Sequence, residues 1–255
     1  VDAVIAVVGL DERSESEGLD RSTMAIPQVQ NDLVDALTAI GKPVIIVLVA
    51  GSPVELPWFD AVSAILYVGL SGQAGASATV RALTGQINPS GRLAETWPIS
   101  YADCPSASWY PAIGRDAIYR EGPFVGYRYY ETTNVPVRFP FGYGLSYATF
   151  TYSDLTADET GVQFTVTNDS DVSGATVAQL YVSGPSEGVL RPARELKGFA
   201  KVQLDARESK TVRIEFDRYT FRHFDTAANA WRTESGVWTL AVGTNAENLP
   251  LTCEF

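Results

Sequence analysis

Residues 3–8 read Ala3-Val4-Ile5-Ala6-Val7-Val8, a run in which every position is apolar. Val44-Ile45-Ile46-Val47-Leu48-Val49 is a second run of this kind, and Ala64-Ile65-Leu66-Tyr67-Val68 is a shorter third. A strand that is apolar at every position, rather than at every other position, is typical of a parallel sheet with both faces covered. The three runs therefore predict a parallel sheet in the first part of the chain.

Helices are predicted between and after these strands. Pro27 is tolerated at the start of a helix, and Gly41 suits the position just after its end. The apolar residues of this segment recur at helical spacing and are expected to form the buried face of the helix: Val29, Leu33, Leu37 and Ile40. Residues 73–83 are rich in alanine and predict a second helix. Strands that alternate with helices indicate an α/β fold with the helices outside the sheet.

An acidic loop follows the first apolar run. Its carboxylates outnumber its two arginines, Arg13 and Arg21. The acidic residues are Asp11, Glu12, Glu15, Glu17 and Asp20. Ligands of open α/β sheets bind at the carboxyl ends of the strands, so a general acid could lie in this loop. A solvated charged loop that only ends a strand has the same composition, and both interpretations are open at this point.

The composition excludes some partners and leaves others open. The chain has 255 residues, enough for two domains, and a net charge of −11. Nucleic acids and anionic membranes attract basic surfaces, so neither is expected as a partner, whereas a neutral sugar is indifferent to this charge. No apolar run is long enough to cross a bilayer. The chain starts directly on a strand without a signal peptide, so we expect the interior of a longer protein, cytoplasmic or secreted.

The cysteines and the single histidine give no catalytic or metal motif. Cys104 and Cys253 are expected to be free thiols, although the sequence does not exclude a disulfide. His223 has no nucleophile elbow near it, so a Ser-His-Asp triad is not indicated and a strand or turn position is expected. We expect neither a metal nor a cofactor.

The composition and the hydrophobic pattern of the chain change at two points after the predicted α/β part. Residues 106–146 combine many aromatic residues with glycine and proline, which indicates a linker loop that packs through its rings or, alternatively, a sugar-binding platform. Residues 147–255 alternate apolar and polar positions between turn signals and predict a β-sandwich of about seven strands. The clearest strands are 162–167, 176–182, 210–216 and 236–242. The predicted boundaries are 1–105, 106–146 and 147–255.

Six motifs follow one another along the chain: Glu17-Gly18-Leu19-Asp20-Arg21 with Ile26-Pro27-Gln28; Ala50-Gly51-Ser52-Pro53-Val54 with Pro57-Trp58; Asn88-Pro89-Ser90-Gly91-Arg92-Leu93; residues 121–130; residues 139–147; and Glu195-Leu196-Lys197-Gly198-Phe199. In this order they resemble the C-terminal part of glycoside hydrolase family 3, the β-glucosidase and β-xylosidase family, over essentially the whole chain. The resemblance implies an α/β sandwich domain, incomplete at its start, followed by a fibronectin type III-like or immunoglobulin-like domain. A preceding TIM-like barrel is implied but lies outside this chain.

The resemblance also implies a function. It points to a retaining exo-β-glycosidase, most simply a β-glucosidase, that hydrolyses O-glycosyl bonds of a β-linked oligosaccharide or glycoside. Such enzymes need two carboxyl groups about 5 Å apart. In the family the nucleophilic Asp belongs to the barrel and the acid/base Glu to the acidic loop. Glu17 is therefore expected as the acid/base, with Glu15 as the second candidate, and the isolated chain is expected to be inactive.

Details of the family pattern differ here. Asp20 and Arg21 are expected to form an ion pair that shapes the loop. Residues 70–75 keep the Gly-Gln of the family's Pro-Gly-Gln-Glu-Gly-Gly turn but lack its Glu, which weakens any role for that turn. The sugar and the linkage stay open, because the barrel would form most of the first sugar site.

Two other functions are compatible with parts of the sequence. A non-catalytic carbohydrate-binding or scaffold module would use the sandwich and the aromatic loop without chemistry. A nucleotide-binding α/β domain is disfavoured, because the sequence lacks G-x-G-x-x-G and places acidic residues where a phosphate would bind.

Overall fold

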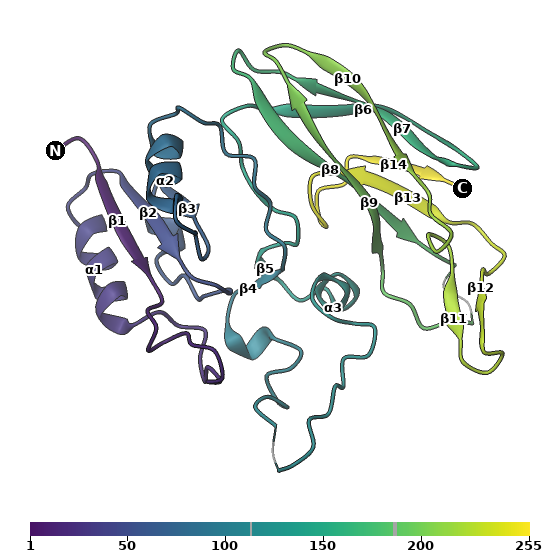
Figure 1. The fold of residues 1–255 in the computed structure, drawn as a ribbon, viewed down its shortest axis with the longest axis horizontal. Helices are drawn as coiled ribbons and strands as arrows, with labels where there is room; N and C mark the ends of the chain where they lie inside the picture. Colours follow the sequence, from purple (N-terminus) through teal and green to yellow (C-terminus); the bar gives the residue numbers. More distant parts are fainter. Residues whose placement is uncertain (113, 186–187) are drawn as a thin grey trace. The chain divides into compact units, whose positions relative to one another are not determined.

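The chain folds into two compact units in the computed structural model, which describes residues 1–112, 114–185 and 188–255 (Figure 1). The first unit comprises Val1–Ile87 and Trp97–Arg120, and the second comprises Asn88–Thr96 and Glu121–Phe255. The short segment 88–96 thus belongs to the second unit although the chain returns to the first after it. The boundaries at 105 and 146 stay predictions.

The first unit is built on a three-stranded parallel sheet in the order β1-β2-β3. Strand β1 covers Val4–Gly9, β2 covers Val44–Val49 and β3 covers Ala64–Tyr67. The central strand β2 buries Ile46 and Leu48 completely, as its continuous apolar character predicted. The parallel pairing predicted from the three apolar runs is therefore confirmed. Cover on both faces is not confirmed for β1, because Ile5 and Val7 are 55% and 69% exposed. The sheets of the second unit are antiparallel.

Helix α1 (Gln28–Thr38) connects β1 to β2, and Figure 1 shows it alongside β1. Helix α2 (Gly75–Leu83) follows β3. Gly41 has a φ of +73°, the left-handed conformation for which glycine is suited after a helix end. The remaining elements of this unit are short: the 3₁₀ turns η1 (Phe59–Ala61) and η2 (Tyr101–Asp103), and β4 (Trp97–Pro98).

The buried side of α1 is not the predicted one. Val29 and Leu33 are 72% and 48% exposed, whereas Asn31 and Val34 are buried. Asn31 tolerates burial because its Oδ1 accepts a hydrogen bond of 2.9 Å from the indole Nε1 of Trp58. The prediction was wrong because helical periodicity marks an apolar face without saying which surface of the protein lies against it.

Among the described residues, the second unit holds two larger antiparallel sheets and a two-stranded hairpin. The first sheet has the order β10-β7-β6 and the second has the order β14-β13-β8-β9. In the first sheet the strands are β6 (Phe150–Asp158), β7 (Gly161–Asn168) and β10 (Ser209–Glu215). In the second they are β8 (Gly174–Ser183), β9 (Glu195–Leu204), β13 (Thr239–Gly243) and β14 (Leu251–Glu254). The other elements are α3 (Tyr127–Thr133), β5 (Val137–Phe139) and the hairpin of β11 (His223–Asp225) with β12 (Ala230–Arg232).

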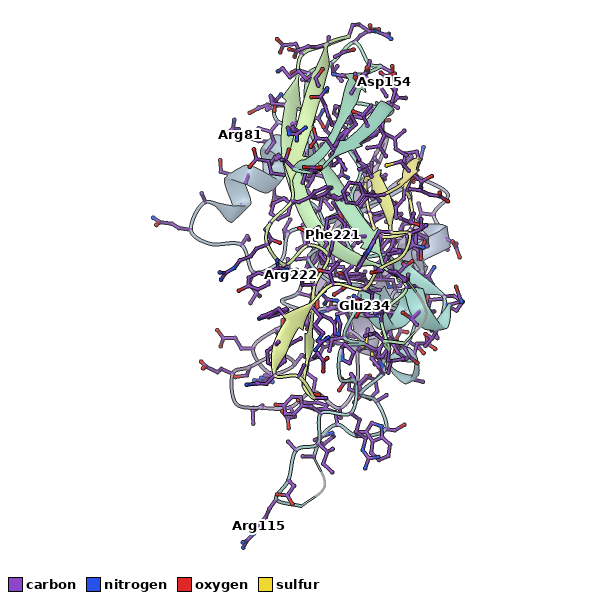
Figure 2. All side chains as sticks on the ribbon, turned by 90° about the vertical axis from the view of Figure 1, so that its right-hand side faces the viewer. Arg81, Arg115, Asp154, Phe221, Arg222 and Glu234 are labelled. Atoms are coloured by element: carbon purple, nitrogen blue, oxygen red, sulfur yellow. The ribbon has the colours of Figure 1, made fainter. Side chains whose placement is uncertain are left out.

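One hydrophobic core joins these two sheets. Phe164 on β7 belongs to the same buried cluster as Leu180 on β8 and Leu240 on β13. Phe221, labelled in Figure 2, extends this core. Its ring meets that of Trp238 edge-on with centroids 5.3 Å apart. Side chains of two facing sheets that share one core are the arrangement of a β-sandwich, so this prediction is confirmed.

The segment 88–96 is fixed into the second unit by polar contacts. Arg92 donates to the carbonyl of Gly144 and, at 3.0 Å, to Oγ1 of Thr176. Burial lowers the pKa of Arg92 below its ordinary value. Asn88 donates to the carbonyl of Ser173 at 3.0 Å and accepts from Ser146 at 2.9 Å. The motif that contains Asn88 and Arg92 therefore attaches residues 144–146 to the start of β8.

Candidate active site

The acidic loop lies at the carboxyl edge of the parallel sheet. It starts after β1, whose last residue Gly9 is in register with Val49, the last residue of β2. The N–H of Leu10 donates to the carbonyl of Val49 at 2.9 Å, so the loop after β1 and the loop after β2 leave the sheet together. This is the edge at which open α/β sheets bind ligands.

Glu15 links the two loops. Its Oε2 accepts from the N–H of Gly51 at 2.8 Å, and its Oε1 accepts from the hydroxyl of Ser52 at 3.0 Å. Arg21 completes the group by donating from Nη1 to the Ser52 hydroxyl at 2.6 Å. A Cβ at Gly51 would lie 2.8 Å from Oε1 of Glu15, so glycine is what lets the carboxylate approach the backbone. Glu15 therefore has both oxygens engaged within the chain.

Glu17 stands on a tight turn. Ser16 and Leu19 form an isolated antiparallel bridge, with the N–H of Leu19 3.3 Å from the carbonyl of Ser16. Gly18, the third residue of this turn, has a φ of +78°, which a type II turn requires and which glycine supplies without strain. Glu17 is exposed, and its carboxylate has no hydrogen bond or ion pair within the described residues. The carboxylate is accessible to an incoming molecule.

The prediction of an ion pair between Asp20 and Arg21 was wrong, because within the described residues the two side chains bind other partners. Oδ1 of Asp20 accepts a hydrogen bond of 2.5 Å from the hydroxyl of Tyr110, while Arg21 turns to Ser52. The bond to Asp20 raises the pKa of Tyr110 above its ordinary value. The two neighbours in sequence thus bind different segments of the same unit.

Asp11 shapes the start of the loop. Its Oδ1 accepts from both the hydroxyl and the N–H of Ser14, at 2.8 and 2.9 Å. The hydroxyl bond first, and then the N–H bond, hold the pKa of Asp11 below its ordinary value. Asp11 is therefore kept ionised as a local structural group, which makes it unsuited to donate a proton near neutral pH.

Three residues that bind the acidic loop were missed by sequence reasoning. Gly51 and Ser52 were quoted as part of a motif, but no partner for them was inferred. Their position directly after a buried parallel strand was a usable signal, because the carboxyl ends of neighbouring strands meet. Tyr110 gave no local signal, because it is separated from Asp20 by 90 positions.

Within the described residues, metal ligands and thiols do not form a second site. Over residues 1–112, 114–185 and 188–255, no three side chains of His, Cys, Asp and Glu gather as metal ligands do. Cys104 and Cys253 are not joined in a disulfide, as expected. His223 lies in β11, with Nδ1 2.8 Å from Glu234 and 3.2 Å from Arg191.

In the same described segments, no helix combines the length and apolarity that crossing a bilayer requires.

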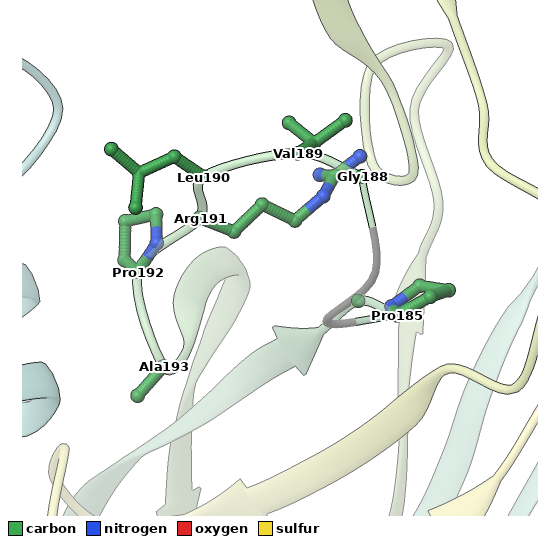
Figure 3. Close-up of a pocket in the computed structure, with 8 residues that line it drawn as sticks. Pro185, Gly188, Val189, Leu190, Arg191, Pro192 and Ala193 are labelled. Carbon is green, nitrogen blue, oxygen red and sulfur yellow. The ribbon is translucent and has the colours of Figure 1, made fainter.

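A hollow of about 470 Å³ lies in the loop between β8 and β9 (Figure 3). Its described lining comes from residues 184–185 and 188–193 and includes one charged side chain, Arg191. That guanidinium already donates to Glu234 and lies over the ring of Trp238 at 5.0 Å. Because its charge is already paired, Arg191 supports the sandwich and gives the hollow no reactive group.

Two sequence families match this chain. Residues 1–147 match the family described as glycosyl hydrolase family 3 C-terminal domain, which is more than half of the chain. The chain belongs to glycoside hydrolase family 3. Residues 176–246 of this family 3 chain match the fibronectin type III-like domain. The resemblance read from the six motifs is thereby confirmed for both parts.

Individual proteins support the same family. The family 3 chain is 40% identical over 258 residues to the thermostable β-glucosidase B of Acetivibrio thermocellus, covering 98% of this chain and 34% of the relative. It is 42% identical over 254 residues to an exo-α-(1→6)-L-arabinopyranosidase of Bifidobacterium breve, covering 97% and 34%. The solved family 3 β-glucosidase of Bifidobacterium adolescentis matches with a TM-score of 0.96 and 41% identity, covering 100% and 39%. The chain spans about a third of the length of the curated relatives it matches.

Proposed function

We propose that this chain is the C-terminal part of a retaining exo-β-glycosidase, most simply a β-glucosidase, that hydrolyses O-glycosyl bonds. Family membership together with the exposed Glu17 carboxylate carries the proposal. The names of the Acetivibrio and Bifidobacterium adolescentis proteins favour glucose as the sugar. The arabinopyranosidase at similar identity indicates that the sugar is chosen largely outside this third of the enzyme.

The chemistry needs two carboxyl groups. In the first step an Asp of a barrel domain attacks the anomeric carbon, while Glu17 gives its proton to the glycosidic oxygen as the C–O bond breaks. In the second step the Glu17 carboxylate takes a proton from water, which attacks the anomeric carbon and releases the Asp. This chain supplies Glu17 and the loop that presents it, and the barrel, placed before it in the same protein, supplies the nucleophile.

The contacts of the two candidates favour Glu17 over Glu15. A general acid must reach the leaving-group oxygen, so its carboxyl has to be open to substrate. Glu15 has both oxygens engaged by Gly51 and Ser52, whereas Glu17 projects from a turn without a partner in the described residues. Glu15 is better suited to hold the loop in which Glu17 acts.

A chimera tests the proposal. This chain replaces the matching third of the Acetivibrio thermocellus relative, and the product is called the chimera below. We expect the isolated chain to leave 4-nitrophenyl β-glucoside intact and the chimera to hydrolyse it. Release of 4-nitrophenol and of glucose is measured, with the unaltered relative as the reference.

Two outcomes would contradict this proposal. One is hydrolysis by the isolated chain, which lacks the proposed nucleophile. The other is an inactive chimera whose size and melting temperature equal those of the relative. If the isolated chain also binds cello-oligosaccharides in a calorimeter, the second outcome favours a non-catalytic carbohydrate-binding module.

Replacing Glu15 by alanine separates the two glutamates. Gly51 and Ser52 lose their common acceptor, and we expect the chain to lose about 1 kcal/mol of unfolding free energy, since the site is half-exposed. We expect the chimera's activity to fall by similar factors for good and poor leaving groups, because the whole loop moves. Urea unfolding and the two rates are measured, with Glu12→Ala as the control in the same loop. Restoration of the Glu15→Ala activity by azide would make Glu15 the acid/base instead.

A further inference from the structure

A second segment of the first unit approaches the acidic loop. Residues 100–110, here called the strap, begin at a capping box in which Asp103 accepts from the N–H and the hydroxyl of Ser100. The N–H of Tyr101 donates to Oε1 of Glu55 at 2.8 Å, which fixes this beginning to the body of the unit. The strap is therefore anchored independently of the acidic loop.

The far end of the strap is also fixed. The N–H of Tyr110 donates to the carbonyl of Ser106 at 2.9 Å, and the Tyr101 hydroxyl donates to the carbonyl of Tyr110 at 3.2 Å. With its backbone held at two points, Tyr110 reaches Asp20 with its hydroxyl at 2.5 Å. Asp20 has no other hydrogen-bond partner in the described part of the chain. The position of Asp20 thus depends on Tyr110.

The turn that carries Glu17 is consequently held on both sides. Before the turn, Glu15 binds Gly51 and Ser52, and after it, Asp20 binds Tyr110. The Glu17 carboxylate itself makes no hydrogen bond or ion pair in the described residues. A proton donor loses much of its rate advantage when it is displaced by about 1 Å, so these supports matter for proton transfer.

We propose that Tyr110 is a positioning residue, whose hydroxyl bond to Asp20 holds the Glu17 turn where its carboxyl can protonate the leaving-group oxygen. This rests on the proposed function. Tyr110 does not touch the reacting atoms and acts through Asp20 and the turn. Because the carboxylate of Asp20 favours the protonated phenol, the hydroxyl remains a donor at neutral pH.

The inference predicts a dependence on the leaving group. Glucose leaves cellobiose only with a proton from the acid, whereas 2,4-dinitrophenolate departs without one. In the chimera, Tyr110→Phe keeps the ring and removes the bond to Asp20. We expect kcat/KM to fall about tenfold on cellobiose and less than about twofold on 2,4-dinitrophenyl β-glucoside. Both rates and the melting temperature are measured.

Three further variants complete the test. Asp20→Ala should reproduce the Tyr110→Phe effect, and the double variant should add nothing, because both changes remove the same bond. Tyr119→Phe is the matched control, since Tyr119 is 89% exposed and we expect no change. The inference would be overturned if Tyr110→Phe left the ratio of the two rates unchanged, or if the effects of Tyr110→Phe and Asp20→Ala added up in the double variant. If Glu17→Ala still shifts that ratio, the proposed function is kept and only the positioning role of Tyr110 is rejected. If Glu17→Ala does not shift the ratio, both the proposed function and the role of Tyr110 are rejected.

Discussion

The Glu17→Ala variant of the chimera is expected to lose about 10²- to 10⁴-fold of its kcat/KM on cellobiose, the usual contribution of a positioned general acid. The loss follows because the departing sugar oxygen leaves as an alkoxide when no proton is supplied. On 2,4-dinitrophenyl β-glucoside we expect kcat/KM to change little, since that leaving group needs no proton. The comparison of the two substrates is therefore a direct measure of acid catalysis.

Azide reports on the second step of the same variant. Without the Glu17 carboxylate, water attacks the glycosyl-enzyme slowly because no base removes its proton. Azide carries no proton to lose, so it should restore kcat on the dinitrophenyl substrate and give β-glucosyl azide, which chromatography identifies. Glu12→Ala, an exposed carboxylate of the same loop, should behave like the unaltered chimera. Full cellobiose activity of Glu17→Ala would remove Glu17 from the mechanism.

The sequence was most informative where burial acts on every residue of a segment. Strand β2 is covered on both faces, so it is apolar throughout and was placed at residues 44–49, as the structure has it. The carboxyl edge of the sheet then followed from the parallel topology, and with it the place of the acidic loop. In the sandwich, the alternation of β7 likewise reflects one buried face.

Sequence reasoning failed where partners are distant or where a strand is partly exposed. The pairing of Asp20 with Tyr110, and not with the adjacent Arg21, depends on how the strap folds back. Strands β6 and β9 were not singled out, because most of their residues are exposed or half-buried and their pairings with β7 and β8 shift register at an irregularity, which interrupts the alternation. Local periodicity cannot supply such information, since it arises from contacts that only the folded chain brings together.

Replacing Phe164 by alanine should destabilise the second unit by about 3–5 kcal/mol, the usual effect of removing a buried phenylalanine. Phe164 is 1% exposed on the central strand β7, and its ring stacks on Tyr152 with centroids 6.2 Å apart. It belongs to the core shared by both sheets, so truncation leaves a cavity that neither sheet can fill alone. Since domains are stable by only about 5–15 kcal/mol, much of the stability would be lost.

The measurement must separate the two units, because the chain need not unfold in one step. Urea unfolding of the 255-residue chain, followed by amide exchange in the peptides of β7 and β8, reports the second unit by itself. Phe199→Ala is the matched control: Phe199 lies on β9 of the same sandwich but is 68% exposed, so its loss should change stability by no more than about 0.5 kcal/mol. If both variants lose the same amount, the core around Phe164 is not what stabilises the sandwich.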